Sequence, residues 1–398
     1  MTTEGTCDPR FENVRSLFQH FLDSGEEIGA SLAVNVNGED VVDLCGGHAD
    51  AARTRPWTRD TIVPVASTTK MISSLAMLLL VDSGAISVRD KVSRHWPAFA
   101  ANGKEGVEIR HLLSHTSGVA GWDDAMTMDE VCDAGPAAAR LARQAPWWEP
   151  GTASGYHAWN FGHLLGEVVR RVTGMGLREY VATRVAGPLG ADFQIGLADE
   201  DEGRLAEFVA AAAPPPPPQE EGSSTGGAAP PKPGALFMKA IGNPVLPPGF
   251  STRLTWKKGE IGASNGYGNA RSLNAMLTCV TLAGREGGAG RKVSLSKETV
   301  DLIFEEQSRG EDLVVGKKIR FGIGYALRGD GDTWADDWLP AGNIAYWGGS
   351  GGSLGIMDVG RGVTITYAMN KRSHEMIGNK ASKSYVKAIY EALGIHIE

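Results

Sequence analysis

The chain has 398 residues, of which 42% are hydrophobic and 22% are charged, a composition typical of a folded globular protein. Its formal net charge of −8 gives no general attraction to phosphate backbones, so nucleic-acid binding is not expected. The longest apolar stretch, around 71–81, contains two serines and is followed by Asp82, so a membrane span is excluded.

The predicted elements begin with a helix over 9–24, where apolar residues recur at helical spacing and Gly25 follows as a stop. Two strands, 28–37 and 41–44, come next around an Asn37-Gly38 turn, which is a strong hairpin signal. Helices then predominate from about 67 to 200. Near the C-terminus the pattern predicts four strands and a closing helix: Arg320–Leu327, Ile344–Trp347, Leu354–Val359 and Val363–Met369, then Lys380–Leu393.

This order of elements is typical of the α+β class. We predict an antiparallel sheet that is completed by both termini and flanked by helices, plus a helical domain. The sheet domain would comprise 10–66 and 240–398, and the mainly helical domain 67–209. The segment 210–234 holds five consecutive prolines followed by Gly and Ser, which predicts a solvated surface insertion. A proline-rich docking site for a partner is the less favoured alternative.

The cysteines indicate a reducing environment. Cys7, Cys45, Cys132 and Cys279 are far apart and form no CxxC pair, which favours free thiols over disulfides or a zinc site. Residues 1–10 are polar and show no secretory leader. We therefore expect a cytoplasmic protein without a metal or other cofactor.

The first candidate for chemistry is Ser67-Thr68-Thr69-Lys70, which opens a segment that is apolar nearly all round and therefore predicts a buried helix. Residues three apart lie on one helix face, so the amine of Lys70 can reach the hydroxyl of Ser67. The N–H groups at a helix N-terminus favour developing negative charge beside Ser67. Burial there lowers the pKa of Lys70 and lets it act as a base. A capping serine with a snorkelling lysine is the structural alternative.

The SxxK pattern occurs three times, and context separates the copies. Ser294–Lys297 precedes an exposed amphipathic helix, where a helix cap is the better explanation. Ser384–Lys387 lies inside the polar C-terminal helix. Only Ser67–Lys70 opens a buried helix, and it is the favoured nucleophile site.

Three further elements follow along the chain: the segment IRHLLSHTSGV at 109–119, Pro150-Gly151 with Tyr156 ahead of a helix, and a glycine-rich strand at 346–354. Together with Ser67–Lys70 these motifs resemble the serine β-lactamase superfamily over about residues 10 to 395. Within it the chain resembles class C β-lactamases, D-alanyl-D-alanine carboxypeptidases and, most closely in motif pattern, family VIII carboxylesterases.

The resemblance implies a β-lactamase/transpeptidase-like fold and roles for particular residues. Ser67 would be the nucleophile, and Tyr156 would exchange protons with Ser67 and the leaving group in concert with Lys70. The backbone N–H groups of Ser67 and Ser350 would form the oxyanion hole. Tyr156 would act as the phenolate or as the phenol, since a tyrosine near a buried cation can have its pKa lowered from about 10 towards neutrality.

Two departures from the family pattern bear on the substrate. The family usually has Tyr-x-Asn, and here Tyr156-His157-Ala158 lacks the amide that helps to orient an acylamino side chain in the β-lactamases; Asn160 comes two residues too late. In place of the Lys-Thr-Gly motif stands Trp347-Gly348-Gly349, which removes the cation that would meet a carboxylate. A neutral or apolar acyl ester is therefore the expected substrate, and the small residues let it approach the strand.

The substrate-binding residues expected on that strand are Trp347, Gly348 and Gly349. Tryptophans near the tyrosine element could line an apolar acyl pocket or belong to the core, and both interpretations stay open: Trp122, Trp147, Trp148 and Trp159. Of these, Trp122 and Trp159 are the predicted pocket residues.

Gly348–Gly352 also matches GxSxG, the nucleophile elbow of α/β-hydrolases, with Ser350 as nucleophile. That fold requires alternating strands and helices upstream, which this chain does not show, so the elbow is rejected. His111 and His115 lack a third ligand that would make a metal site, and we expect them to be structural.

We therefore predict a carboxylesterase-like serine hydrolase that cleaves a small-molecule ester through a Ser67 acyl-enzyme, with Lys70 and Tyr156 as proton-transfer groups. An acyltransferase of the same fold, acting on a natural product, would use the same residues with an alcohol in place of water. A β-lactamase or D-amino-acid peptidase is disfavoured by Trp347 and by the missing leader. A non-catalytic binding protein would have little reason to keep the three residues together.

Overall fold

The computed structural model describes residues 2–210, 234–247, 249–288 and 290–397. The predicted insertion 210–234 therefore lies, apart from its two end residues, outside the described residues. That insertion and the division into a sheet domain and a helical domain stay predictions.

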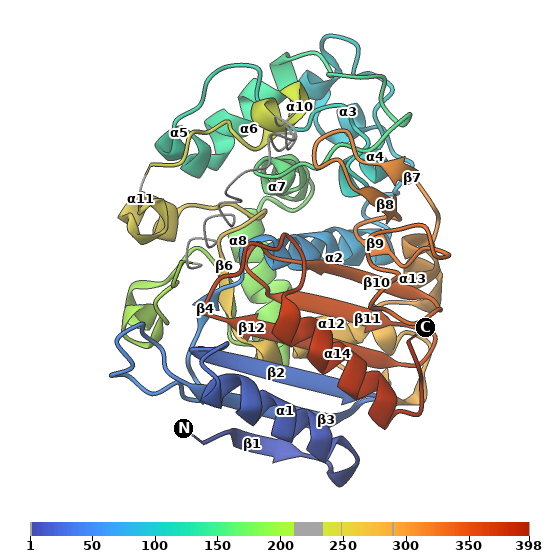
Figure 1. Cartoon of the computed structure of the whole chain (residues 1–398). Coiled ribbons are helices and arrows are strands. Elements are labelled where there is room, and N and C mark those ends of the chain that lie inside the picture. The colour runs from blue at the N-terminus through green and yellow to red at the C-terminus, as the bar shows by residue number, and fades with distance from the viewer. Residues whose placement is uncertain (1, 211–233, 248, 289, 398) are drawn as a thin grey trace, which may run out of the picture.

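A nine-stranded antiparallel sheet forms the centre of the molecule (Figure 1). Its strands are β1 Glu4–Cys7, β2 Gly29–Val36, β3 Glu39–Gly47, β7 Ser308–Glu311, β8 Lys318–Phe321, β9 Ala326–Leu327, β10 Ile344–Gly348, β11 Leu354–Asp358 and β12 Val363–Met369. They run in the order β1-β3-β2-β12-β11-β10-β9-β8-β7. Because β2 pairs directly with β12, the prediction that both termini complete one antiparallel sheet is confirmed.

The strand predicted over Arg320–Leu327 is wrong in its extent. The chain leaves the sheet after Phe321 and re-enters it at Ala326. Between these points Gly324 has a φ of 90°, a conformation that favours glycine and turns the chain. The two edge strands, β1 and β7, were not predicted, since they are short, largely exposed and polar.

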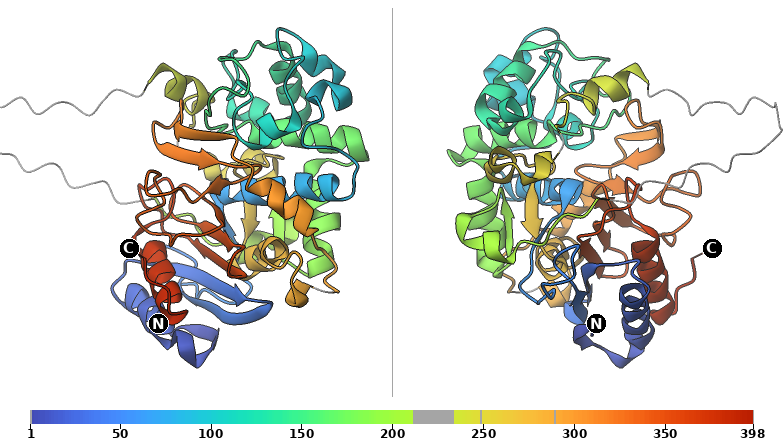
Figure 2. Two further views of the ribbon diagram at one scale, coloured as in Figure 1. Left: turned by 90° about the vertical axis from the view of Figure 1, so that its right-hand side faces the viewer. Right: turned by 60° about the vertical axis from the view of Figure 1, so that its left-hand side comes forward.

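Helices cover both faces of the sheet. On one face α1 (Glu12–Asp23) and α14 (Lys380–Ala392) lie side by side, as Figure 2 shows. The ring of Tyr385 packs against Phe18 and Phe21, with centroids 5.7 and 5.5 Å apart. On the other face α12 (Ala270–Thr281) contacts β2, β11 and β12, and it also contacts α2 (Thr69–Asp82). Helix α2 is buried along nearly its whole length, as its apolar sequence predicted.

The remaining helices lie mostly in the part of the molecule above α2 in Figure 1. They are α3 Val92–His95, α4 Ile109–Leu113, α5 Met128–Cys132, α6 Ala134–Arg143, α7 Phe161–Thr173, α8 Leu177–Tyr180, α9 Gly187–Leu189, α10 Ala235–Ala240, α11 Leu254–Lys258 and α13 Lys297–Ile303. Short 3-10 turns include Pro9–Phe11, Ala66–Thr68, Pro97–Ala100 and Phe250–Thr252. None of the helices in the described residues is long and apolar enough to cross a bilayer.

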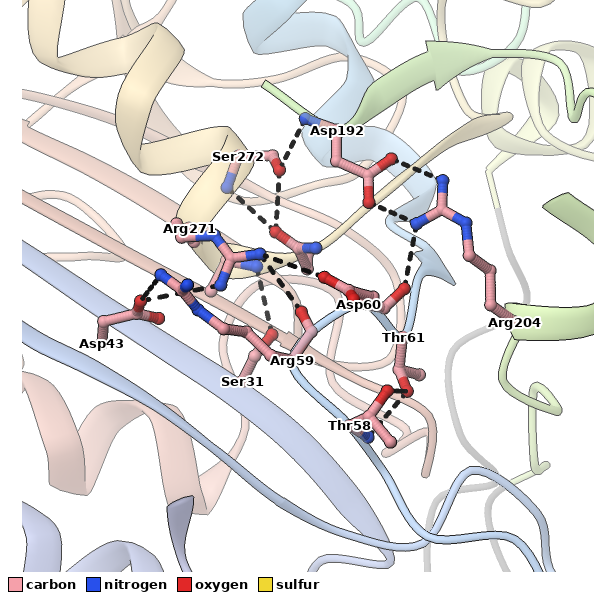
Figure 3. Close-up of polar contacts among 12 residues, drawn as sticks. Ser31, Asp43, Thr58, Arg59, Asp60, Thr61, Asp192, Arg204, Arg271 and Ser272 are labelled. Atoms are coloured by element: carbon pink, nitrogen blue, oxygen red, sulfur yellow. Dashed lines mark hydrogen bonds and ion pairs between the residues drawn. The ribbon is translucent and has the colours of Figure 1, made fainter. Parts of the chain in front are cut away.

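A second, three-stranded sheet leads the chain towards Ser67. Its strands, in order, are β4 Val63–Pro64, β6 Gly266–Gly268 and β5 Phe193–Ile195. Polar contacts anchor the approach to β4 (Figure 3): Arg204 pairs with Asp192 and donates to the carbonyl oxygen of Asp60 at 2.9 Å. Arg271 of α12 donates to the carbonyl oxygen of Arg59 at 3.2 Å. The segment before β4 is therefore tied to both β5 and α12.

Glu27, between α1 and β2, is a buried carboxyl that is only 1% exposed. Tyr367 of β12 donates a hydrogen bond to its Oε1, and its Oε2 has no partner among the described residues. Burial raises the pKa of Glu27 to about 8, so the group is protonated at neutral pH. The pKa of Glu27 in the folded state lies above the ordinary value of 4.5, so protonation of this group favours folding. Its contribution to the free energy of unfolding is complete below pH 4.5 and is lost as the pH rises to 8.

We predict that Glu27→Gln flattens the pH dependence of stability. The amide keeps the shape of the carboxyl and stays uncharged, so above pH 8 the variant should be more stable than the wild type, by about 5 kcal/mol. At pH 5 the two should be similar, and urea unfolding at both pH values measures this. Glu26→Gln, at the exposed neighbouring residue, is the control for a lost charge. A Glu27→Gln variant that keeps the wild-type pH dependence would contradict the protonated state.

Candidate active site

Ser67 lies in the Ala66–Thr68 turn between β4 and α2. The turn is fixed on both sides, because the N–H of Val65 donates to Gly266 O at 2.9 Å and the N–H of Thr68 donates to Val65 O at 3.1 Å. Ala66 has a φ of 46°, a left-handed conformation that costs a non-glycine residue about 1–3 kcal/mol. Such strain is typical of functional sites, and here it precedes the residue that the sequence singles out.

The amine of Lys70 is buried beside Ser67. Nζ lies 3.4 Å from Ser67 Oγ and donates to the carbonyl oxygens of Ala158 at 2.8 Å and Ala263 at 2.9 Å. Burial lowers the pKa of Lys70 well below its usual 10.5. A neutral amine has two N–H groups and one lone pair. In that neutral form the two carbonyls would accept both hydrogens, and the lone pair would face Ser67 Oγ.

Two glycines in contact bring these carbonyls together. Gly162 in the first turn of α7 packs against Gly262, so closely that a Cβ on Gly162 would lie 2.4 Å from the Cα of Gly262. Ser73 of α2 donates to Gly262 O at 2.6 Å. The segments that carry Ala158 and Ala263 are therefore held against each other and against α2.

Tyr156 lies on the other side of Lys70 and is 5% exposed. Its ring centroid is 4.7 Å from Lys70 Nζ and 5.1 Å from the centroids of both His115 and Trp347. The indole Nε1 of Trp347 donates to Tyr156 Oη at 3.3 Å. The structure thus brings Ser67, Lys70, Tyr156 and Trp347 to one place.

Of the two forms considered for Tyr156, its surroundings favour the phenol over the phenolate. Burial raises the pKa of Tyr156 to about 12, although hydrogen bonds to Ser67 and Trp347 act in the opposite direction. Burial also favours the neutral amine of Lys70. In this environment both side chains are therefore shifted towards their uncharged forms.

Asp312, which sequence reasoning missed, fixes the segment of Tyr156. This fully buried carboxylate follows β7, and its Oδ1 accepts hydrogen bonds from the N–H groups of Tyr156, Val314 and Val315, each at 3.0 Å. Burial raises the pKa of Asp312. No local pattern marks it, because its contact with Tyr156 spans 156 residues.

The turn after β10 packs against the turn of Ser67. A Cβ on Gly349 would lie 2.4 Å from Val65 O, so only glycine allows this approach. Ser353 Oγ donates to Val65 O at 2.8 Å and lies 2.9 Å from Thr68 Oγ1. Within the described part of the chain, the backbone N–H groups of Ser67 and Ser350 have no hydrogen-bond acceptor.

A cavity of about 330 Å³ opens at Ser67. It is lined mainly by aromatic and aliphatic side chains, including Tyr156, Trp159, Phe208, Phe237, Ile241, Phe250, Trp256 and Trp347, together with Gly348, Ser350 and Arg372. Trp159 donates from Nε1 to Ile241 O at 3.1 Å, which fixes its ring on the wall. Of the predicted substrate-binding residues, Trp347, Gly348 and Trp159 line this cavity.

Trp122 does not line it, and that prediction is wrong. Trp122 is fully buried in the core, where its Nε1 donates to Ala137 O at 2.9 Å and its ring packs edge-on against His163. Gly349 faces the turn before Ser67 rather than the cavity.

The residues after Tyr156 serve the structure around it. His157 is fully buried between Ser117 Oγ and Gly155 O, each at 2.7 Å, and burial lowers its pKa to about 4. Asn160 donates to Val119 O at 2.7 Å. Ala158, at the position of the family's asparagine, contributes the carbonyl that holds Lys70.

The other motifs have structural places. The SxxK pattern at 294–297 ends at the first residue of α13, but Ser294 is not the helix cap. The cap is Ser296, whose Oγ accepts a hydrogen bond from Thr299 N at 3.2 Å. The copy at 384–387 lies in α14, as predicted. His111 accepts from Glu108 N at 3.1 Å in a capping box. All four cysteines are free, and the described residues hold no group of three or more metal-ligating side chains.

Comparisons with known proteins identify the family of the chain. The Beta-lactamase family model matches residues 14–386. The crystal structure of a family VIII carboxylesterase matches with a TM-score of 0.88 at 32% identity, over 98% of this chain and 100% of that one. "Esterase/beta-lactamase LipL" of Mycobacterium tuberculosis is 29% identical over 375 residues, 92% of this chain and 82% of LipL. "Esterase EstB" of Burkholderia gladioli is 33% identical over 196 residues, 44% of this chain and 48% of EstB.

The fold is that of the β-lactamase/transpeptidase-like proteins, as predicted. The chain belongs to the β-lactamase family, and it is a serine hydrolase of this superfamily.

We predict that Gly162→Ala lowers the free energy of unfolding by about 1–3 kcal/mol, because its methyl group would press on the backbone of Gly262. Gly203→Ala is the control. Gly203 is an exposed residue of the short 3-10 helix Asp199–Arg204, and a Cβ there meets open space, so this change should leave the free energy of unfolding within about 0.5 kcal/mol. Urea unfolding measures both, and a loss of similar size at both sites would argue against the close contact.

Proposed function

We propose that the protein is a carboxylesterase that cleaves a small-molecule ester through an acyl-enzyme on Ser67. The observation that carries this proposal is the buried amine of Lys70, whose hydrogens are taken by two carbonyl oxygens 2.8 and 2.9 Å away while Ser67 Oγ lies 3.4 Å from Nζ. Tyr156, held by Trp347 and Asp312, supplies the second proton-transfer group.

The proposed reaction begins when Ser67 Oγ attacks the ester carbonyl carbon and the neutral amine of Lys70 takes the serine proton. As the bond to the leaving alcohol breaks, the phenol of Tyr156 donates its proton to the alcohol oxygen. The Lys70 ammonium then restores the phenol. Water attacks the acyl-enzyme with help from the same groups, and the acid and free Ser67 are released.

The developing oxyanion needs donors that are not already in use. The backbone N–H groups of Ser67 and Ser350 both lack an acceptor within the described ranges, and both residues line the cavity. This supports their proposed role as the oxyanion hole.

The relatives favour ester cleavage. Two of the similar proteins carry the word esterase in their names, and the similar structure is that of a carboxylesterase. An acyltransferase that acts on a natural product would use the same acyl-enzyme and pass the acyl group to an alcohol. The ratio of transfer to hydrolysis, measured with added alcohols, separates the two activities.

The nucleophile is tested by covalent labelling. A 4-nitrophenyl alkylphosphonate should add one phosphonyl group, located at Ser67 by intact mass and peptide mapping. Ser67→Ala should abolish labelling and turnover, whereas Ser384→Ala, in the SxxK copy of α14, should leave both unchanged. A label on Ser350, or no label on the active wild type, would overturn the assignment.

The pH profile tests the base. Because only the neutral amine accepts a proton, kcat/KM for a neutral ester should rise with pH through one ionisation below 10.5, that of Lys70. It should not fall again before the phenol of Tyr156 ionises, near pH 12. Lys70→Arg should abolish turnover, since a guanidinium stays protonated. A descending limb near neutrality that Tyr156→Phe removes would contradict a protonated Tyr156.

A further inference from the structure

Arg372 places a positive charge on the wall of the active-site cavity. It follows β12 and lines the cavity together with Ser67, Tyr156 and Ser350. Its Nη2 donates to Ser350 Oγ at 2.8 Å. The backbone N–H of Ser350 also has no acceptor among the described residues, so the guanidinium stands beside the proposed oxyanion hole.

The side chain of Arg372 is held in place from three sides. Its own N–H donates to Val209 O at 2.9 Å, and the N–H of Ser373 donates to Gly351 O at 2.9 Å. Its stem packs on Gly351, where a Cβ would lie 3.1 Å from the Arg372 Cγ. Its guanidinium carbon lies 5.0 Å from the centroid of the Phe208 ring. The charge is therefore positioned before any ligand binds.

This charge has no counter-ion among the residues that the structure describes. None of the described Asp or Glu residues contributes to the cavity wall, and the nearby Glu375 is paired with Lys383. The Nε of Arg372 is buried and has no acceptor within the described ranges, so the guanidinium is not fully hydrogen-bonded by them.

We propose that Arg372 binds a carboxylate of the substrate, so that the ester cleaved at Ser67 also carries a carboxylate close to its scissile carbonyl. This inference rests on the proposed function of the same site. A guanidinium offers parallel N–H donors that match the two oxygens of a carboxylate. One guanidinium balances one negative charge, and the mainly apolar wall suits a carboxylate on an apolar body better than a phosphate.

The proposal revises the substrate expected from the sequence. Trp347 stands where the family has a lysine, which predicted a neutral ester. Arg372 supplies a cation to the same cavity from a different segment, the one that follows β12. The cavity thus has a cation that can meet a substrate carboxylate, although the family's lysine is absent.

Two pairs of esters of matched shape test the proposal. 4-Nitrophenyl hydrogen adipate and 4-nitrophenyl hexanoate place or omit the charge in the acyl part, and the butyrates of 3-hydroxybenzoic acid and 3-hydroxybenzamide do so in the alcohol part. For at least one pair the wild type should prefer the anionic ester in kcat/KM. Arg372→Met should reduce that ratio about 10- to 100-fold, mainly through KM, and Arg372→Lys should reduce it less.

Arg184→Met is the matched control, because it removes the same formal charge from an exposed side chain and should leave the ratio unchanged. Benzoate should inhibit the wild type competitively and lose this effect in Arg372→Met, which reports binding without turnover. Equal rates within both pairs, or a ratio that neither Arg372 variant changes, would overturn the proposal. Labelling of the wild type by a neutral phosphonate is a separate result: a label on Ser67 with no charge preference refutes only the carboxylate site, whereas no label refutes the proposed function itself.

Discussion

The buried amine of Lys70 is the interaction on which the site depends. It joins its own helix to two chain segments that are 88 and 193 residues away, and it does so through main-chain carbonyls rather than a carboxylate. A permanent charge would be expensive at that depth, so the neutral form is favoured. The two carbonyl contacts also hold the segment before α7 and the loop before β6 against α2.

The turns around this amine tolerate little change in shape. The backbones of Gly162 and Gly262 lie so close together that no methyl group fits between them. The same holds where Gly349 meets the backbone of Val65. Ser353 bridges the second approach with two hydrogen-bond contacts. Close backbone packing therefore sets the position of the serine and of the amides beside it, and side chains such as Asp312 refine the position of the tyrosine.

The sequence predicts those features that depend on residues close to one another in the chain. The spacing of Ser67 and Lys70, the hairpin at Asn37-Gly38 and the buried α2 are local patterns, and the structure has all three. Tyr156 needed the family resemblance. Asp312 and Arg372 carry no local signal, because what distinguishes them is their contact with segments far away in sequence. The carbonyl oxygens of Ala158 and Ala263, which accept from Lys70, could not be predicted, because every residue has such a group.

Tryptophans illustrate the same limit. Trp122 and Trp159 read alike in the sequence, yet one belongs to the core and the other to the cavity wall. Trp122 packs on His163 of α7, whereas Trp159 donates to Ile241 O, so contacts with segments distant in sequence decide which ring lines the cavity.

The pairing of β2 with β12 also has a consequence for biosynthesis. Strand β2 is among the first elements to be translated, but its partner β12 is translated more than 300 residues later (residues 29–36 and 363–369). Until then one edge of β2 is unpaired and α1 lacks α14, and such open edges are where nascent chains aggregate. The sheet closes only when β12 enters between β2 and β11, so folding of the centre of this protein is completed at the end of translation.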